Sequence, residues 1–213
     1  FSKLIDTNND IKGSLDYTVS GSSIKKDTNV DEKLLINDLN YTSNPFFSTL
    51  GTISNFDLIL KNAIKEGDKS DKYRDETQSE SFGNLIFTSS LPLIKKTNTH
   101  ISNLTPKLSA RFSPVKSDDI KNLDRKISAT NIFSKNRLGL TDSLEGGQSL
   151  TLGIDYDLKN INNTTLLGAS LGQIYRDTND NKLPITSKMN KKSSDIVGNI
   201  SLFPSNEAFQ LNY

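Results

Sequence analysis

The chain lacks the features that mark several common protein classes. Its 213 residues contain no cysteine and one histidine, and no apolar run approaches the roughly 18 residues of a transmembrane helix. The absence of cysteine excludes a disulfide-built scaffold and thiolate metal sites within this stretch. A formal net charge of +1 gives the chain no overall attraction to nucleic acid.

Apolar residues are also scarce. They make up 33% of the chain, and the mean hydropathy is −0.50, whereas globular domains are roughly 45–50% apolar. Such a composition is typical of disordered or strongly hydrated chains. Regular alternation of apolar and polar residues argues against disorder, because a disordered segment has no reason to keep a period of two. The length suits one all-β domain.

The clearest alternation follows the Gly146-Gly147 turn. Between residues 148 and 158, leucine, isoleucine and tyrosine alternate with serine, threonine, glycine and aspartate. Successive side chains of a strand point to opposite faces, so this segment has one apolar and one polar face. Repeated segments of roughly 10 such residues, separated by polar turns, are typical of transmembrane β-barrels, whose interiors are polar.

The same pattern recurs along the chain, broken by loops rich in Asn, Asp, Lys, Ser and Gly. The predicted strands are Ile11–Ser20, Glu32–Thr42, Leu50–Ala63, Ser81–Leu93, His100–Phe112, Ile127–Phe133 (weaker), Gln148–Leu158, Thr164–Tyr175, Ser193–Phe203 and Glu207–Tyr213. Polar loops are predicted at Gly21–Asp31 and Lys65–Gln78. The predicted fold class is therefore all-β: an antiparallel transmembrane β-barrel, a meander of about 10–11 strands.

Three local features qualify this pattern. Phe56–Ile64 also has helical spacing, but period two fits it better. Pro92 and Pro106 lie inside predicted strands, and each is predicted to mark a strand end or a bulge because proline lacks a ladder donor. Pro204-Ser205-Asn206 predicts the turn of a closing hairpin. A soluble β-sandwich or β-solenoid remains the alternative architecture.

Two phrases of the sequence stand out: NIFSKNRLGLTDSLEGGQSLTLG, starting at Asn131, and SLGQIY, starting at Ser170. Together they resemble the LPS-assembly protein LptD family. The residues that match the first phrase are Asn131, Phe133, Ser134, Asn136, Arg137, Asp142, Glu145, Gly147, Thr151 and Gly153. Those that match the second are Ser170, Gly172, Gln173 and Tyr175. Four further stretches resemble the alphaproteobacterial version of the family: Ser90–Leu93, Leu104–Ser109, Phe112–Pro114 and Ser194–Gly198.

The resemblance implies a non-enzymatic conduit that inserts lipopolysaccharide into the outer leaflet of the outer membrane of a Gram-negative bacterium. It implies a barrel on the order of 26 strands, an LptE-like plug lipoprotein and a periplasmic LptA-like bridge. The sequence contains no signal peptide and begins with Phe1, so either a signal was removed or the sequence is an internal fragment. We expect residues 1–213 to be an internal, mid-barrel fragment with no second domain.

The sequence departs from the family pattern at three positions. Gly139 stands one place early, and Ser143 and Gln148 replace two arginines that the family usually has. Roles tied to those arginines are therefore not carried over.

No catalytic, cofactor-binding or metal-binding constellation is predicted. His100 has no evident nucleophile beside it, and a strand-end position explains it. Asp177–Asn181 mimics the start of a calcium loop but has Lys182 where the sixth-position glycine belongs. Asp6–Asp10 fails in the same way. Both segments are predicted to be polar turns.

Basic pairs and inward acids are the remaining candidates. Lys25-Lys26, Lys95-Lys96 and Lys191-Lys192 are expected to be solvated loops, with contacts to lipopolysaccharide phosphates as the alternative. Asp155 and Asp157 are expected either to line a polar lumen or to meet the plug.

Two other functions stay open. A smaller stand-alone porin or channel would fit the alternating, aromatic-ended Phe209–Tyr213, which resembles a terminal assembly signal. An outer-membrane phospholipase would need a histidine beside a serine in the wall, and His100 offers no such pairing.

Overall fold

One antiparallel sheet forms the framework of this computed structural model, which describes residues 2–6, 12–27, 29–203 and 209–212. The sheet has twelve strands in the order β1-β2-β3-β5-β6-β8-β9-β10-β11-β12, with β4 paired to β5 and β7 to β8. The strands are β1 (Ser2–Asp6), β2 (Lys12–Lys25), β3 (Asp31–Ser43), β4 (Phe46–Phe47), β5 (Ile53–Asp68), β6 (Gln78–Ser90), β7 (Leu93–Lys96), β8 (His100–Ser113), β9 (Gly147–Asn160), β10 (Thr165–Arg176), β11 (Val197–Leu202) and β12 (Phe209–Asn212).

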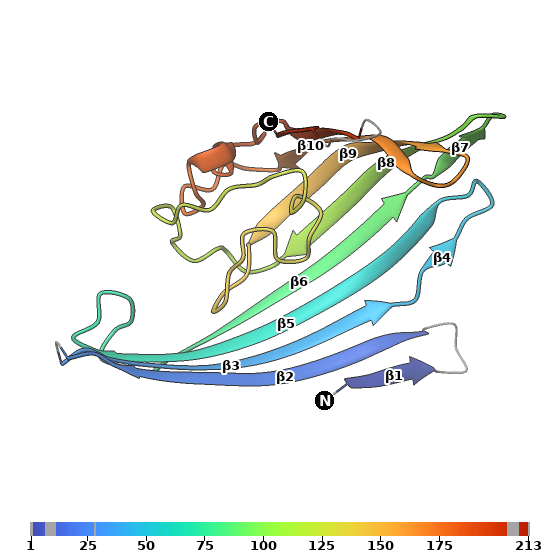
Figure 1. The fold of residues 1–213 in the computed structure, drawn as a ribbon. Helices are drawn as coiled ribbons and strands as arrows, with labels where there is room; N and C mark the ends of the chain where they lie inside the picture. Colours follow the sequence, from blue (N-terminus) through green and yellow to red (C-terminus); the bar gives the residue numbers. More distant parts are fainter. Residues whose placement is uncertain (1, 7–11, 28, 204–208, 213) are drawn as a thin grey trace.

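The predicted all-β antiparallel meander is confirmed. Ten strands follow one another across the sheet, and the two additional strands, β4 and β7, are short. The sheet curves strongly but stays open, with β1 at one edge and β12 at the other (Figure 1). Among the described residues, one helical turn occurs, the irregular 3-10 turn η1 (Thr186–Lys188), in which Ser187 has a φ of 56°.

The period-two pattern predicts the two faces correctly. On β9, Leu150, Leu152 and Ile154 are exposed on the convex side, whereas Ser149 and Thr151 are buried on the concave side. Phe56–Ile64 lies within β5 and is extended, as the period predicted. We call the convex side the outer face and the concave side the inner face.

Two strands run beyond the predicted boundaries. β2 continues to Lys25 and β5 to Asp68, so both enter stretches predicted as polar loops. The ladder continues there because backbone hydrogen bonds pair regardless of side-chain polarity. Ile24 pairs with Glu32, and Lys33 pairs with Glu66, in unbroken register. Apolar alternation therefore gave strands that were too short at this end.

The two prolines behave differently. Pro92 separates β6 from β7, as predicted for a strand end. Pro106 lies inside β8 opposite Ile154 in continuous register, so the strand end or bulge predicted there is wrong. Proline has no backbone N–H to donate, and Pro106 stands where the strand paired with β8 changes from β7 to β6. Its carbonyl accepts a hydrogen bond from the backbone N–H of Leu91 at 3.0 Å.

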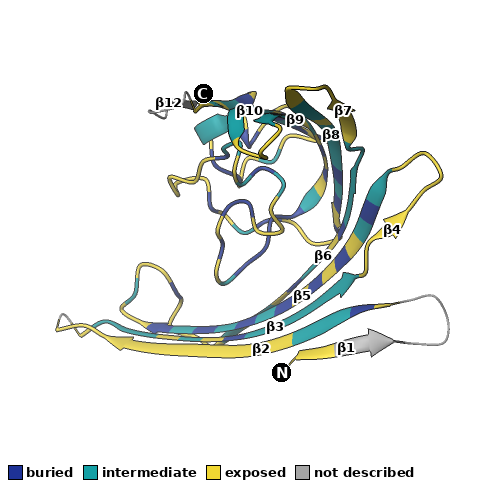
Figure 2. Ribbon diagram, turned by 45° about the vertical axis from the view of Figure 1, so that its right-hand side comes forward, coloured by how far each residue is buried: buried dark blue, intermediate teal, exposed yellow. Residues whose placement is uncertain are grey.

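Two long loops fold back into the hollow of the sheet (Figure 2). They are residues 114–146, called here the inward segment, and residues 177–196. The predicted strand Ile127–Phe133 is wrong: these residues form tight turns within the inward segment. Ile127 and Ile132 instead join a buried cluster with residues of both loops and the sheet. The cluster comprises Ile120, Ile127, Ile132, Leu138, Leu140, Ile174, Leu183, Met189 and Val197.

The sheet has two unlike ends. The connections β2–β3, β5–β6, β8–β9 and β10–β11 lie at one end, which we call the long-loop end because it includes the two inward loops. The connections through β4 and β7 and the β9–β10 turn lie at the other, the short-turn end. The predicted strand Ser193–Phe203 begins only at Val197, because residues 193–196 belong to the second loop.

Some predictions concern residues that the structure does not describe. The turn at Pro204-Ser205-Asn206, the start of the strand at Ile11 and most of Asp6–Asp10 lie there. Within the predicted strand Glu207–Tyr213, Phe209–Asn212 forms β12 and pairs with β11.

Candidate functional site

The outer face of the sheet is apolar and exposed. Rows of side chains cross neighbouring strands on this face, and the pairing register aligns them. One row contains Leu58, Leu85 and Phe112, which are 38%, 46% and 47% exposed. An apolar surface of this extent marks a site that meets another apolar phase or partner.

Three phenylalanines of the outer face stack together. The ring centroids of Phe56 and Phe87 lie 5.1 Å apart, and Phe46 lies 5.6 Å from Phe56. Phe46 and Phe56 are nevertheless 45% and 41% exposed. Exposed aromatic clusters near strand ends are typical of the girdles that border the apolar band of membrane barrels.

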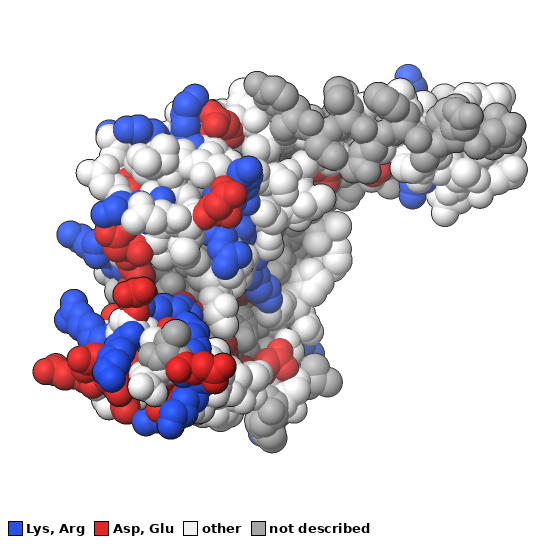
Figure 3. All heavy atoms as spheres, turned by 60° about the vertical axis from the view of Figure 1, so that its left-hand side comes forward, with Lys and Arg blue, Asp and Glu red and all other residues white. Residues whose placement is uncertain are grey.

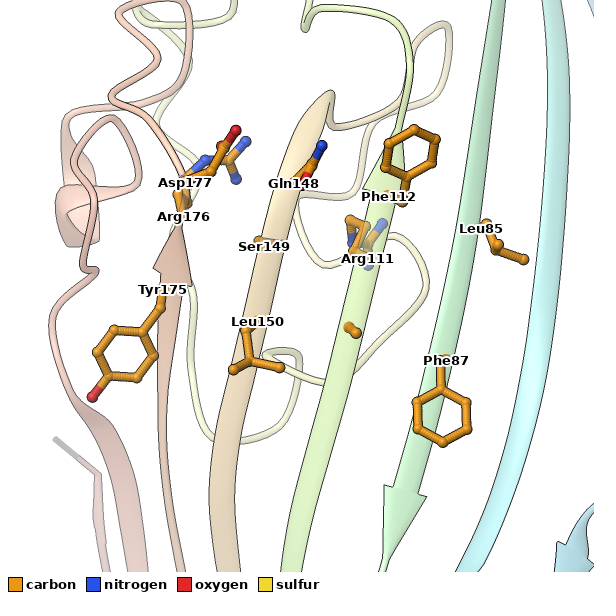
Figure 4. Close-up of a pocket in the computed structure, with 11 residues that line it drawn as sticks. Leu85, Phe87, Arg111, Phe112, Gln148, Ser149, Leu150, Tyr175, Arg176 and Asp177 are labelled. Carbon is orange, nitrogen blue, oxygen red and sulfur yellow. The ribbon is translucent and has the colours of Figure 1, made fainter.

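A shallow depression of about 480 Å³ interrupts the outer face over β6, β8, β9 and β10. Leu85, Phe87, Phe112, Leu150 and Tyr175 surround it (Figure 4). Ala110 forms part of its lining, and this small residue stands in the row between Phe87 and Leu150. The depression forms because the small side chain of Ala110 stands between the larger side chains of Phe87 and Leu150.

The inner face carries a buried ionic cluster. Glu145, from the inward segment, accepts hydrogen bonds from Nε and Nη2 of Arg137 at 2.7 and 2.5 Å, and its Oε1 also contacts Arg176 of β10. The side chains of the three residues are only 2–3% exposed. Arg137 further donates to the hydroxyls of Thr151 and Ser149, both at 2.9 Å. This cluster joins the inward segment to β9 and β10.

Burial of charges is tolerated here because they are paired. An unpaired ion in a protein interior is strongly destabilising, whereas a hydrogen-bonded pair is tolerated. Burial by itself disfavours the ionised carboxylate of Glu145, but Arg137, Arg111 and Arg176 outweigh it and hold the pKa of Glu145 far below its usual range. Glu145 therefore stays ionised and supplies one negative charge among these three arginines.

Further polar contacts hold the inward segment to the wall. Arg111 of β8 donates to the carbonyls of Lys135 and Ser134 at 2.8 and 3.1 Å. Lys61 of β5 donates to the carbonyl of Thr141 at 2.8 Å. Lys135 lies 2.7 Å from the buried carboxylate of Asp57 on β5. The anchors come from several strands, so the segment is fixed along its length.

Phe133 packs where the sheet has a glycine. A Cβ on Gly153 would lie 2.7 Å from the Phe133 ring and from the carbonyl of Leu171. Lys107 stands 5.7 Å from the centroid of the same ring. The close approach of ring and backbone requires glycine at position 153.

Two asparagines of the first LptD-like phrase form hydrogen bonds within the inward segment. The side chain of Asn136 bonds both the backbone N–H and the carbonyl of Leu140, at 2.9 and 2.6 Å. The side chain of Asn131 accepts from the N–H of Ser128 at 2.8 Å and donates to the carbonyl of Lys126 at 3.0 Å. Asparagine side chains commonly stabilise turns in this way.

The second phrase lies on β10 directly beneath. Gly172 faces Ile132, whose Cδ1 would lie 3.1 Å from an added Cβ. Gln173 donates to the carbonyl of Ser194 at 2.9 Å and accepts from the hydroxyl of Tyr175 at 2.7 Å. Gly172 of the second phrase therefore belongs to the seat of the inward segment, whereas Gln173 contacts the loop 177–196.

The structure gives the other candidate residues ordinary surroundings. His100 is exposed at the tip of the β7–β8 hairpin, where its Nδ1 lies 2.8 Å from the Thr99 hydroxyl. Asp177 and Asp180 accept hydrogen bonds from the N–H groups of Thr178 and Lys182, as residues of polar turns. Within the described residues, no group of acidic or histidine side chains could hold a metal ion.

The basic pairs separate between the two ends of the sheet. Lys25-Lys26 and Lys191-Lys192 lie at the long-loop end, and Lys95-Lys96 lies at the short-turn end. Asp155 and Asp157 are on the inner face, as predicted, and Asp155 forms an ion pair with Lys107.

The positions that depart from the family pattern have different environments. Ser143 is 1% exposed within the inward segment, whereas Gln148 lies beside the outer-face depression. Gly139 adopts a φ of +61°, which glycine accepts without strain.

Sequence reasoning missed the partners that complete the ionic cluster. Arg111 lies on a predicted strand and Arg176 directly follows another, but the sequence does not connect them with Glu145, because strand register and the path of a long loop are not readable from one sequence. A usable signal existed: on alternating strands, both arginines occupy the polar, inner-face positions.

No helix among the described residues is long and apolar enough to cross a membrane. No curated protein matches the sequence. A family model described as "LptD: LPS transport system D" matches residues 57–209, which include most of β5, the strands from β6 to β11, the inward segment and the ionic cluster. Because this match covers well over half of the chain, the protein belongs to the LptD family of the lipopolysaccharide transport system.

Proposed function

We propose that this chain forms part of an outer-membrane translocon that inserts lipopolysaccharide into the outer leaflet of a Gram-negative outer membrane. It acts as a conduit and carries out no chemical step. Its partners are lipopolysaccharide, the bilayer, an LptE-like plug lipoprotein and an LptA-like periplasmic bridge.

The observation that carries this proposal is the distribution of side chains on strands that the LptD family model matches: apolar side chains are exposed and charged side chains are buried. On β5, the exposed positions are Phe56, Leu58 and Leu60, and the buried ones include Asp57 and Lys61. A water-soluble domain would bury the first set and expose the second. An apolar exterior around a polar interior is the arrangement that a bilayer requires of a barrel wall.

An open sheet supports the view that residues 1–213 are one part of a larger barrel wall, placed mid-barrel. Unpaired strand edges cannot remain in hydrocarbon, because their N–H and C=O groups would lose all hydrogen-bond partners. β1 and β12 occupy the two edges of this sheet, and we propose that further strands pair with them in the bilayer.

The lengths of the connections support an orientation. Membrane barrels have short periplasmic turns and longer extracellular loops. The long-loop end would then face the cell exterior, and the inward segment would enter the lumen from that side. Its turns and anchors would narrow the interior beside β8, β9 and β10, and would guide the polar part of lipopolysaccharide away from this stretch of wall.

Depletion of the full-length protein in its own bacterium tests the proposal against the porin alternative. The translocon predicts that newly made lipopolysaccharide fails to reach the cell surface and accumulates in inner-membrane fractions. Uptake of small hydrophilic solutes should not fall. Reduced solute uptake with normal surface lipopolysaccharide would support the porin instead and contradict the proposal.

A further inference from the structure

The depression on the outer face changes in polarity along the strands that form it. Gln148 and Asp177 are exposed and border it on the side of the loops. Phe87 and Leu150 line it farther from the loops (Figure 4). The depression is therefore polar at the edge nearest the long-loop end and apolar below that edge.

The long-loop end itself is charged. Acidic and basic side chains intermingle over its loops (Figure 3), and several form ion pairs, including Lys33 with Glu66 and Lys65 with Glu80. Charged side chains are costly in hydrocarbon, so these loops mark the side on which the wall leaves an apolar phase. The depression lies on the outer face just below this boundary.

Paired strands fix the shape of the depression. Ala110 on β8 pairs with Phe87 on one side and with Leu150 on the other, and Phe112 pairs with Leu85 two residues nearer the loops. The volume of about 480 Å³ falls in the range of roughly 300–1,000 Å³ that holds small ligands. A site on strands keeps its shape better than a site on loops.

The described part of the chain leaves the depression uncovered. Leu85 and Phe112 at its edge are 46% and 47% exposed, and Leu150 is 37% exposed. A gap beside large apolar side chains forfeits dispersion contacts that a fitting apolar group would restore. The occupant that restores them must come from outside the described chain.

The polar groups behind the depression are already engaged. Arg111 and Arg176 contribute to its lining, but their guanidinium groups turn to the inner face. There Arg111 donates to the carbonyl of Lys135, and Arg176 contacts Glu145. The exposed polar groups at the edge are an amide and a carboxylate, so the depression suits a hydrocarbon chain and not a phosphate.

We propose that the depression binds one acyl chain of a lipopolysaccharide molecule in the outer leaflet. This inference rests on the proposed function, because it requires the outer face to lie in a bilayer with the long-loop end at the cell exterior. Lipopolysaccharide is then the lipid of the leaflet that the depression meets. The chain packs against Phe87, Ala110 and Leu150. The group that joins the chain to its sugar lies level with Gln148, whose side-chain amide can donate a hydrogen bond to it.

The test uses the full-length protein in nanodiscs that contain equal amounts of lipopolysaccharide and phosphatidylethanolamine. The photoreactive residue p-benzoylphenylalanine replaces Phe112 at the edge of the depression, and mass spectrometry identifies the lipids that it captures. Ala110→Leu fills the depression and keeps it apolar. Ala169→Leu is the matched control, because it makes the same change on the outer face of β10, outside the depression.

We expect lipopolysaccharide adducts at position 112 to exceed phosphatidylethanolamine adducts. They should fall about fivefold or more with Ala110→Leu, because the added side chain occupies the space of the acyl chain, and stay unchanged with Ala169→Leu. Ala110→Val adds less volume and should give a smaller decrease. Heat-modifiable migration should match the parent protein for every variant; if Ala110→Leu alone fails to fold, Ala110→Val decides.

Equal capture of both lipids, or no loss of adducts in the Ala110 variants, would overturn the site. Capture of phosphatidylethanolamine in preference to lipopolysaccharide, with the same dependence on Ala110, would identify a phospholipid site and would also overturn the proposal. Failure of the proposed function looks different. Neither lipid would then be captured at position 112 or by p-benzoylphenylalanine in place of Leu152, which is 42% exposed on the outer face of β9.

Discussion

β5 shows side by side the two environments that this chain is built to meet. Phe56, Leu58 and Leu60 point outward and remain exposed, whereas Asp57 and Lys61 point inward and are buried. The inner residues are covered by the inward segment and satisfied by ion pairs with Lys135 and Asp38. The outer residues have no protein cover of this kind.

On β5, therefore, the residues that the protein buries include charged ones, and the residues that it leaves exposed are apolar. In a soluble domain, the buried set is the apolar set, and its burial drives folding. On β5 the exposed apolar residues gain nothing until lipid covers them, whereas the buried Asp57 and Lys61 are held by charge pairing and hydrogen bonds, beside the buried apolar Ile59. Stability of the wall and stability of its interior should therefore respond to different substitutions.

The largest effect is expected at the centre of the ionic cluster. Glu145→Gln would leave Arg137 and Arg176 buried without a counter-charge, and losing one partner of a buried pair destabilises by roughly 3–5 kcal/mol. Urea unfolding of the full-length protein in micelles, followed by heat-modifiable migration, measures this loss. Glu76→Gln, in an exposed loop, is the matched control, and an equal response of both variants would contradict the cluster's role.

Acidification should act on the same carboxylate. The pKa of Glu145 is lower in the folded state than the roughly 4.3 of an unfolded glutamate. Its contribution is therefore fully present above that value and is lost only as pH falls towards the folded-state pKa. We expect the inward segment to resist protease at pH 5 as it does at pH 7 and to open only in stronger acid. Opening between pH 7 and 5 would show that Glu145 is not the controlling group.

The next largest effect is expected on the outer face. Leu58→Lys would place a charge in the apolar band, which destabilises membrane barrels by roughly 2–4 kcal/mol at the bilayer midplane. Thr88→Lys puts the same residue on the inner face of the adjacent strand β6 and should be much milder. Folding yield into lipid vesicles compares the two. Similar folding yields for the two variants would contradict the view that only the outer face lies in lipid.

A smaller effect is expected at the seat of the inward segment. Gly153→Ala would place a Cβ 2.7 Å from the Phe133 ring, and overpacking of this kind destabilises by roughly 1–3 kcal/mol. Gly168→Ala is the control, because its nearest neighbour, Asp157 Oδ1, would be 3.8 Å away. Limited proteolysis between residues 114 and 146 should accelerate only for Gly153→Ala. Equal proteolysis rates for the two variants would show that the Phe133 ring does not pack against residue 153.

The smallest effect is expected at the exposed ion pair of Lys33 and Glu66, whose side chains are 55% and 40% exposed. Exposed pairs contribute little because water and salt screen them. Lys33→Gln should leave the urea unfolding midpoint unchanged within error. A clear shift would show that the long-loop end contributes to stability through its surface charges.

The sequence allowed the wall to be predicted well and its interior poorly. Alternation depends only on neighbouring residues, so β9 and β10 could be placed from the leucines and the polar residues between them. The ends of β2 and β5 could not, because paired backbone groups extend the ladder into polar residues. Pro106 misled for a similar reason, since the strand beside it changes there.

The inward segment lay beyond sequence reasoning for a different physical cause. Ile127 and Ile132 resemble a short strand, but their burial depends on contacts with β10 and the loop 177–196. The contact of Glu145 with Arg176 spans 31 residues, and no local pattern encodes it. The family-like phrases marked these residues without revealing that they form one cluster. The alphaproteobacterial character inferred from Ser90–Leu93 stays a prediction.

The most direct test of the account is a spin-label scan of β10 in the full-length protein in lipid bilayers. A nitroxide is placed at each position from 166 to 175, and its collision rates with oxygen and with a water-soluble nickel chelate are measured. The account predicts a period of two, with high oxygen and low nickel accessibility at Leu167, Ala169 and Leu171, and low oxygen accessibility at Gly168, Ser170 and Gly172. Uniform accessibility, or greater nickel accessibility at the leucines, would contradict a wall whose outer face lies in lipid.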